Sequence, residues 1–237
     1  MFCYSFIFII NYRMIIWLSL SGLIIFIAYL LGSIPTGYIA VKAIKGIDIR
    51  DIGSGSTGAT NVLRTLGKGS GAFVLGIDCL KGLLAIYCTY AWFHFALNND
   101  LLPINLDIQL WQQWLVNISG VAAILGHSKS LFLGFTGGKS VATSLGILLA
   151  INWQVALATI GIFILILAIF RIVSLSSICS AITVPLAMVS IRQPLAYIIF
   201  SVIGGLYVIW RHKSNIQRLL LGTEAKLGQV VRIETSE

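Results

Sequence analysis

Long apolar runs separated by short polar segments make up most of this sequence. A helix that crosses a membrane needs about 20 consecutive apolar residues. Five runs each fit one such helix, the third after extension on both sides: residues 15–38, 71–97, 114–125, 176–191 and 195–210. The pattern therefore predicts an all-α integral membrane protein.

Residues 141–170 form a further uncharged run, which is too long for one upright helix. As one span, it would place the basic C-terminal tail outside. As two short spans broken near Asn152 and Trp153, it places the tail inside. Cytoplasmic loops carry an excess of Lys and Arg, which favours two spans. We expect about seven transmembrane helices, N-terminus out and C-terminus in, with only Arg13 and Arg192 of the sixteen Lys and Arg residues on the outer face.

This map places every polar cluster on the cytoplasmic face, so any chemistry is expected there. The clusters are residues 53–64, 126–140, 171–177 and 211–224. No internal repeat or linker divides the chain, and we expect a single domain over residues 14–237. Residues 1–13 are interpreted as an N-terminal extension or as the result of a start assigned upstream of Met14.

Composition agrees with a membrane protein and narrows its partners. Of the 237 residues, 58% are hydrophobic and 10% are charged, whereas soluble domains carry roughly 25% charged residues. A net charge of +8 is also found in nucleic-acid-binding proteins, but this sequence has no basic arm and no zinc-ligand spacing. Membrane topology and contact with anionic lipid explain the positive charge better.

The first polar cluster, residues 53–64, is rich in glycine and hydroxyl side chains and leads into a helix. Small residues leave backbone N–H groups open to an anion, and a helix N-terminus adds its positive end. Thr57, Thr60, Asn61 and Arg64 are spaced to share one helix face. The cluster is interpreted as a phosphate site. The alternative is a flexible loop followed by an interfacial helix whose Arg meets lipid headgroups.

The second cluster, residues 134–140, resembles the nucleotide-binding loop GxxxxGK[ST] but does not match that motif at every position. That motif requires glycine at position 133, where this chain has Leu133. A local anion cradle remains, built from the glycine amides and the Lys139 ammonium group. The alternative is a glycine-rich hairpin with an anchoring lysine.

Polar residues near or inside the spans have structural interpretations. Asp78 and Lys81 stand one turn apart and are expected to pair with each other or with the loops, because an unpaired charge in a span is costly. His127, at a membrane edge, is interpreted as a structural hydrogen-bonding residue rather than a catalytic base.

Motifs that other chemistries require are missing. No His is followed five positions later by Asp, so the HxxxxD dyad of the common glycerolipid acyltransferases is absent. Neither a G-x-S-x-G nucleophile elbow nor a Cys/His set with metal-ligand spacing occurs, and we expect no metal. What remains is a set of anion sites that can hold two phosphates together.

Taken in order along the chain, these motifs closely resemble the PlsY family, the bacterial acyl-phosphate:glycerol-3-phosphate acyltransferases. The resemblance extends from about Gly32 to Gly228. The segments that carry it are residues 51–67, 78–82, 126–127, 137–143, 171–177 and 212–219, with Gly222 and Glu224.

The loop of residues 128–140 departs from the family pattern. Similar proteins usually have an aromatic–proline pair where this chain has Ser128-Lys129-Ser130. They commonly have Lys and Gly where this chain has Thr136 and Ser140. The central Gly-Gly-Lys is intact, and activity is therefore expected to be retained.

The resemblance implies transfer of an acyl group from acyl phosphate to the first hydroxyl, sn-1, of glycerol 3-phosphate. The products are lysophosphatidic acid and phosphate, in the first step of phospholipid synthesis, with no cofactor. It also implies the bacterial cytoplasmic (inner) membrane, an active site facing the cytoplasm, and the enzyme that makes acyl phosphate as a candidate partner. An acyl phosphate carries a good leaving group, so catalysis can rest on alignment and charge stabilisation.

The resemblance to the PlsY family also implies site residues, which are assigned to the matching positions of this sequence. We hypothesise that Arg64, Lys139 and Asn215 grip the glycerol phosphate and orient its hydroxyl, and that a substrate phosphate oxygen takes the hydroxyl proton. The expected substrate-binding residues are Ser54, Gly55, Thr60, Asn61, Gly137, Gly138, Ser176, Ser177 and His212.

One alternative comes from another class, a small transporter of an organic phosphate. Transporters of this kind bind anions at broken helices and are built from related halves. This sequence shows no related halves, and its polar clusters map to one face. A second alternative is an acyltransferase that uses a thioester donor, either acyl-carrier protein or acyl-CoA.

Overall fold

The computed structural model describes residues 2–103 and 107–228, with side chains from residue 12 onward. Within these ranges the chain is helical, with one isolated antiparallel bridge between Ser130 and Thr136. The seven longer helices are α1 (Phe2–Ser33), α4 (Lys68–Asn98), α5 (Ile108–Ser128), α6 (Val141–Ile151), α7 (Trp153–Phe170), α8 (Val173–Ser190) and α9 (Leu195–Arg211). The shorter ones are α2 (Thr36–Lys45), α3 (Ala59–Leu66), α10 (Lys213–Leu220) and the 3-10 helices η1 (Ile49–Asp51) and η2 (Leu131–Leu133).

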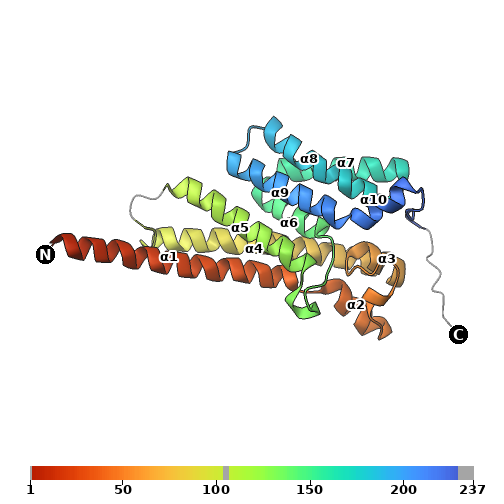
Figure 1. The fold of residues 1–237 in the computed structure, drawn as a ribbon, viewed down its shortest axis with the longest axis horizontal. Coiled ribbons are helices and arrows are strands. Elements are labelled where there is room, and N and C mark those ends of the chain that lie inside the picture. The colour runs from red at the N-terminus through yellow and green to blue at the C-terminus, as the bar shows by residue number, and fades with distance from the viewer. Residues whose placement is uncertain (1, 104–106, 229–237) are drawn as a thin grey trace.

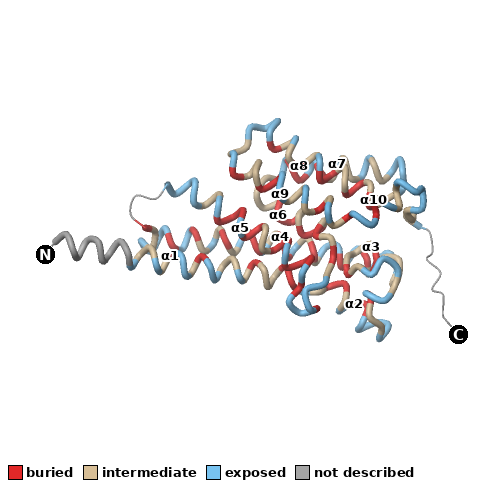
Figure 2. Tube along the Cα trace, viewed as in Figure 1, coloured by how far each residue is buried: buried red, intermediate tan, exposed pale blue. Residues whose placement is uncertain are grey.

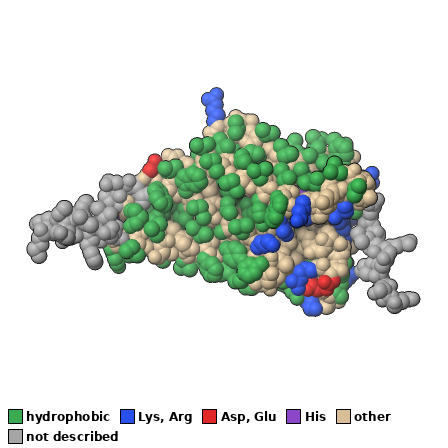
Figure 3. All heavy atoms as spheres, in the orientation of Figure 1, with side chains coloured by type: hydrophobic (Ala, Val, Ile, Leu, Met, Phe, Trp, Pro, Cys, Tyr) green, Lys and Arg blue, Asp and Glu red, His purple; other side chains and the backbone are tan. Residues whose placement is uncertain are grey.

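The long helices run along the long axis of the molecule in two groups (Figure 1). One group holds α1, α4 and α5, and the other holds α7, α8 and α9, with α6 between them. The short helices α2, α3 and α10 gather at one end, which we call the polar end. Most of the Lys and Arg side chains visible in Figure 3 lie near this end, while hydrophobic side chains cover much of the remaining surface.

Length and composition make four segments suitable for crossing a membrane: Tyr12–Lys45, Lys68–Asn98, Trp153–Phe170 and Val173–Ser190. Helices α9 and α10, bent by 60° relative to each other, add a fifth if they are taken as one segment. The all-α prediction is confirmed for the described residues. The count of seven spans and their orientation stay predictions.

The expected break in the 141–170 run is present, and Asn152 makes it. Helix α6 ends at Ile151 and α7 begins at Trp153, where the Asn152 side chain accepts a hydrogen bond from the Val155 N–H at 3.0 Å. Asparagine at this position satisfies a backbone donor that the first turn of a helix leaves unpaired. The 11 residues of α6 make it about 16 Å long, roughly half of a hydrocarbon core about 30 Å thick.

Helix α6 is held against α4 by two glycines, and this contact positions the polar loop that precedes α6. A Cβ atom on Gly82 would lie 2.1 Å from the Thr143 carbonyl oxygen, and one on Gly146 would lie 1.8 Å from the Cys79 carbonyl oxygen. Only glycine allows the two backbones to approach this closely, as is common between membrane helices. Buried residues lie mainly where the helices face one another (Figure 2).

A buried ion pair joins α4 to the end of α1, as the sequence predicted. The Lys81 Nζ atom lies 2.9 Å from Asp78 Oδ1 and donates to the Ile34 carbonyl oxygen at 2.9 Å. The Asp78 and Lys81 side chains are 2% and 4% exposed, so each charge depends on the other for compensation. His127 Nδ1 lies 3.7 Å from the same Asp78 oxygen.

Candidate active site

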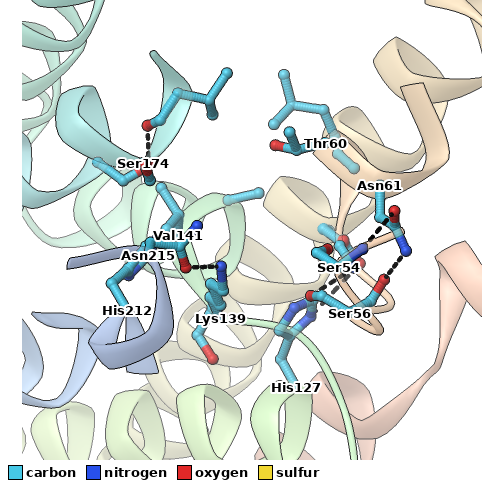
Figure 4. A pocket seen from close by; sticks show the side chains of 18 of the residues that line it. Ser54, Ser56, Thr60, Asn61, His127, Lys139, Val141, Ser174, His212 and Asn215 are labelled. Carbon is cyan, nitrogen blue, oxygen red and sulfur yellow. Dashed lines mark hydrogen bonds and ion pairs between the residues drawn. The ribbon is translucent and has the colours of Figure 1, made fainter. Parts of the chain in front are cut away.

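A polar pocket of about 120 Å³ opens at the polar end, between α3, the start of α6, the start of α8 and α10 (Figure 4). The predicted site residues that line it are Ser54, Thr60, Asn61, Arg64, Lys139, Ser177, His212 and Asn215. Segments far apart in the sequence therefore meet here, as the phosphate-site interpretation requires. The remaining predicted residues, Gly55, Gly137, Gly138 and Ser176, do not line the pocket.

Asn61 shapes the glycine-rich loop from within. Its Nδ2 donates to the carbonyl oxygens of Ile52 at 2.9 Å, Ser56 at 3.0 Å and Ile49 at 3.3 Å, and its Oδ1 accepts from the Ser54 N–H at 3.4 Å. The residue is 2% exposed. Its amide is thus occupied by the backbone of the loop, which it holds together.

The same asparagine explains one glycine of the loop. Gly53 has a φ of 60°, in the left-handed region that glycine adopts without steric cost. A Cβ atom there would lie 2.5 Å from Asn61 Oδ1. Glycine at position 53 therefore allows the loop to fold around the Asn61 side chain.

Helix α3 presents Thr60 and Arg64 one turn apart, and both line the pocket. Among the residues that the structure describes, the Arg64 guanidinium makes one long hydrogen bond, from Nη2 to the Ala225 carbonyl oxygen at 3.4 Å. The shared helical face predicted for four residues is shorter than expected, because α3 begins at Ala59 and leaves Thr57 in the loop.

A chain of hydrogen bonds holds Lys139 at the other side of the pocket. The Lys139 Nζ atom donates to Asn215 Oδ1, and Asn215 Nδ2 donates to Glu224 Oε1 at 2.6 Å. Glu224 also accepts from Ser174 Oγ at 2.8 Å and from Arg218 Nε at 2.7 Å. The Lys139 and Asn215 side chains point toward each other in Figure 4. The network joins the loop before α6 to α8, α10 and the segment after α10.

The charges of this network shift the pKa values of its members. Burial lowers the pKa of Lys139 to about 8; Glu224 opposes the shift, and Arg218, Arg211 and Arg64 add to it. Burial alone would raise the pKa of the Glu224 carboxyl. The hydrogen bonds from Asn215, Ser174 and Arg218 outweigh burial and hold that pKa below its usual value. Glu224 is therefore a carboxylate at neutral pH.

His212 has one ring nitrogen committed to the backbone. Its Nδ1 lies 2.7 Å from the Val208 carbonyl oxygen, and because a carbonyl only accepts, Nδ1 carries a proton. Within the described part of the chain, Nε2 makes no hydrogen bond, which leaves this nitrogen to a ligand.

Gly137 and Gly138 differ from the predicted cradle. The Gly138 N–H donates to the His127 carbonyl oxygen at 3.1 Å, so this amide is not open to an anion. The carbonyl oxygens of both glycines accept from Arg211 Nη2, at 3.3 and 2.9 Å. A Cβ atom on Gly138 would lie 2.1 Å from His127 Nε2. The two glycines let the loop pack over His127, and the next two residues, Lys139 and Ser140, line the pocket.

The serines that depart from the family pattern each find a partner. Ser128 Oγ lies 2.5 Å from the Tyr207 hydroxyl, and Ser130 Oγ donates to the Ser33 carbonyl oxygen at 2.6 Å. Ser140 has a left-handed φ of 63°, a conformation that costs a non-glycine residue about 1–2 kcal/mol. Its Oγ donates to the Ile124 carbonyl oxygen at 2.8 Å, which offsets part of that cost.

Three further residues of the site were not selected from the sequence. Glu224 was recognised only as part of the C-terminal motif, yet it is the one acidic residue between positions 211 and 228, where four Lys and Arg residues surround it. A single carboxylate among four cations was the sequence signal that could have identified Glu224 as a site residue. Ser174 and Arg218 contact the carboxylate of Glu224. Ser176, which was selected, instead donates its hydroxyl to the Ile172 carbonyl oxygen within α8.

An apolar groove of about 350 Å³ continues from the polar pocket between α6, α7, α8 and α9. Leu75, Val141, Ala142, Phe163 and Ser177 line both. The site thus combines cations at one end with a hydrocarbon-lined space at the other. Among the described residues, no group of three or more His, Cys, Asp or Glu residues is placed to hold a metal ion.

Comparison with known proteins gives one consistent match. The family model described as glycerol-3-phosphate acyltransferase matches residues 22–222. A protein of that name from Nostoc sp. (strain PCC 7120 / SAG 25.82 / UTEX 2576) is 68% identical over 221 residues, covering 93% of this chain and 98% of the relative. Another, from Acaryochloris marina (strain MBIC 11017), is 53% identical over 226 residues, covering 94% of this chain and 99% of the relative.

Two solved structures share the fold. Both are crystal structures of PlsY (YgiH), an integral membrane glycerol 3-phosphate acyltransferase, and both are 35% identical to this chain and cover 88% of it. The glycerol 3-phosphate form has a TM-score of 0.76, and the match covers 96% of that structure's chain. The lysophosphatidic acid form has a TM-score of 0.74, and the match covers 95% of that structure's chain.

The role assigned to Asn61 is testable without substrate. Asn61→Asp keeps the size of the side chain but replaces an amide that donates to three carbonyls with a carboxylate that repels them. We expect the amides of residues 49–56 to exchange hydrogen at least about tenfold faster in this variant, since losing the hydrogen bonds weakens the loop by about 1.4 kcal/mol or more. Hydrogen–deuterium exchange measured in detergent checks this. Unchanged exchange would contradict the role of Asn61 in holding this loop.

Proposed function

Because the chain belongs to the glycerol-3-phosphate acyltransferase family, PlsY, we propose that its acyl donor is an acyl phosphate and its acceptor is the sn-1 hydroxyl of glycerol 3-phosphate. The hydroxyl oxygen bonds to the acyl carbon, and the bond from that carbon to the phosphate oxygen breaks. Phosphate leaves with the electron pair. The products are lysophosphatidic acid and inorganic phosphate.

The observation that carries this proposal is the continuity of the polar pocket with the apolar groove. Arg64 and Lys139 line the pocket, and cations of this kind bind phosphate oxygens strongly when partly desolvated. The groove that continues from the pocket is lined almost wholly by apolar atoms. A substrate with a phosphate head and a hydrocarbon tail matches both parts at once. The family assignment also favours acyl transfer over transport of an organic phosphate.

We assign the roles as follows. Arg64 and Lys139 hold the two phosphate groups side by side, so that the hydroxyl of one substrate lies against the acyl carbon of the other. Both ends of the Asn215 amide are used, on Lys139 and Glu224. Asn215 therefore positions Lys139. Ser54, Thr60 and Ser177 supply hydroxyl groups around the phosphates.

The proton of the attacking hydroxyl needs an acceptor. Ser174 donates to Glu224 at 2.8 Å, and both line the pocket. This carboxylate also accepts from Asn215 and Arg218, which hold its pKa low and make it too weak a base to activate the serine. We assign the proton to an oxygen of the acyl-phosphate head, which becomes more basic as the bond to the acyl carbon breaks. Catalysis then rests on alignment and on charge stabilisation by Arg64 and Lys139.

The location of the reaction follows from the charge distribution. The polar end carries the pocket and most of the visible Lys and Arg side chains, and positive charge favours the cytoplasmic side of a membrane. We propose that the pocket faces the cytoplasm at the bacterial inner membrane. There it would take glycerol 3-phosphate from solution and acyl phosphate from the enzyme that makes it.

The reaction is tested by forming lysophosphatidic acid from palmitoyl phosphate and labelled glycerol 3-phosphate in reconstituted membranes. We expect Lys139→Ala to lower kcat/KM at least about a hundredfold, because one lost charge contact to a transition state costs on that order. Lys45→Ala, which removes an exposed cation at the end of α2, is the control and should stay within about twofold. Product from a thioester donor but none from palmitoyl phosphate would contradict the proposed donor.

The lowered pKa of Lys139 predicts a pH dependence. With its pKa at about 8, the ammonium group loses its proton as pH rises through 8, and phosphate binding weakens. We expect kcat/KM for glycerol 3-phosphate to fall about tenfold per pH unit above that value, because kcat/KM reports the free enzyme. Initial rates between pH 6 and 9.5 measure it, with Lys45→Ala as a variant that keeps the same profile. A flat profile up to pH 9.5 would show that Lys139 remains charged or does not hold substrate.

A further inference from the structure

The apolar groove has a measurable depth along α9. Phe200, Gly204 and Val208 follow one another at four-residue spacing and all line the groove, so they lie on one face of the helix. Val208 stands one turn from His212, which lines the polar pocket. At 1.5 Å per residue, the groove extends about 6 Å from Val208 to Gly204 and about 12 Å to Phe200.

Buried apolar side chains line the groove at its far end. Phe200 is 5% exposed, and its ring lies 3.0 Å from the position that a Cβ atom on Gly120 would take, so it is packed firmly against α5. Leu148 on α6 and Val184 on α8 also line the groove and pack in one buried cluster. Each stands seven residues from the lining residue nearest the polar pocket on its own helix, which places both at about 10 Å depth.

Between these two ends, Gly204 leaves open space. A Cβ atom built on Gly204 would meet only the Ile124 Cδ1 atom, at 3.8 Å, an ordinary van der Waals distance. Gly205 serves a different purpose, since its Cβ would lie 2.8 Å from the Ala181 carbonyl oxygen, where α8 and α9 touch. The missing side chain at position 204 is therefore room in the groove rather than a requirement of helix packing.

We infer that Gly204 is a specificity-determining residue that sets how long an acyl chain the groove accepts. This rests on the proposed function, in which the groove holds the acyl tail. The depth of about 12 Å approaches half of a hydrocarbon core about 30 Å thick, the length that one leaflet of acyl chains occupies. Measured from His212 in the polar pocket, Gly204 stands about 12 Å along α9 and Phe200 about 18 Å. A side chain at position 204 would therefore leave room for an octanoyl chain but not for a palmitoyl chain, and Phe200 lies where the longer chain ends.

The experiment compares acyl phosphates from octanoyl to stearoyl with Gly204→Leu, Gly204→Ala and the parent protein. Gly204→Leu should lower kcat/KM for palmitoyl phosphate at least about tenfold more than for octanoyl phosphate, since single methylene misfits in apolar pockets are worth about 10–200-fold. Gly204→Ala, which adds one methyl group to open space, should shift the same ratio less and in the same direction. Gly161→Leu is the matched control. Gly161 is exposed on α7 with nothing near its missing side chain, so this change should leave the ratio unaltered.

Contrary outcomes separate the two proposals. An unchanged ratio of palmitoyl to octanoyl activity in Gly204→Leu overturns the inference and leaves the proposed function standing. If Gly204→Leu does not fold, the same result in Gly204→Ala has that consequence. An equal loss for every donor overturns it as well, because a chain-length determinant must discriminate. If the parent protein uses no acyl phosphate of any length, the proposed donor fails, and the inference falls with it.

Discussion

The carboxylate of Glu224 is the interaction on which the arrangement of the polar end depends. It accepts hydrogen bonds from Asn215, Ser174 and Arg218 and so connects α8, α10 and the segment that follows α10. Through Asn215 it also fixes the Lys139 ammonium group. Several cations crowd a small, partly desolvated space, and one buried carboxylate reduces their mutual repulsion while leaving the pocket positive. That balance suits the binding of phosphate.

The position of Lys139 in the site depends on close contact between helices α4 and α6. Gly82 and Gly146 bring α4 and α6 together, and the Asp78–Lys81 pair ties α4 to the end of α1. Because interiors are close-packed, these contacts fix where α6 begins, and therefore where Lys139 stands. The apolar groove lies on the opposite side of α6 from this contact. The polar pocket and the apolar groove thus share one short helix.

The sequence predicted those features that depend on local pattern. Apolar run lengths predicted the helices, and the length of the uncharged stretch together with the basic C-terminal tail predicted the break near Asn152, because hydrophobic length and the placement of positive charge can be read along the chain. The pairing of Asp78 with Lys81 followed from one-turn spacing and the cost of an unpaired charge. The meeting of Arg64, Lys139 and Asn215 in one pocket was reached through family resemblance, and the structure brings all three to the pocket.

Other features depend on contacts between distant segments and could not be predicted. Asn61 was interpreted as a ligand because its amide suits phosphate, but the loop of residues 49–56 folds around that amide. The Gly138 amide was expected to face an anion, yet it pairs with the carbonyl of His127. In each case a polar group near the site forms hydrogen bonds with backbone carbonyl oxygens instead of facing a ligand. Spacing alone does not tell which of a loop's polar groups face inward and which meet a ligand.

The central claim is that Arg64 and Lys139 form the phosphate-binding part of the site, and a structure of this protein with glycerol 3-phosphate bound tests it most directly. The account predicts phosphate oxygens within hydrogen-bond distance of both side chains, with the Asn215–Glu224 contact intact. A phosphate bound away from the polar pocket, with Arg64 still on the Ala225 carbonyl and Lys139 occupied only by Asn215, would contradict it.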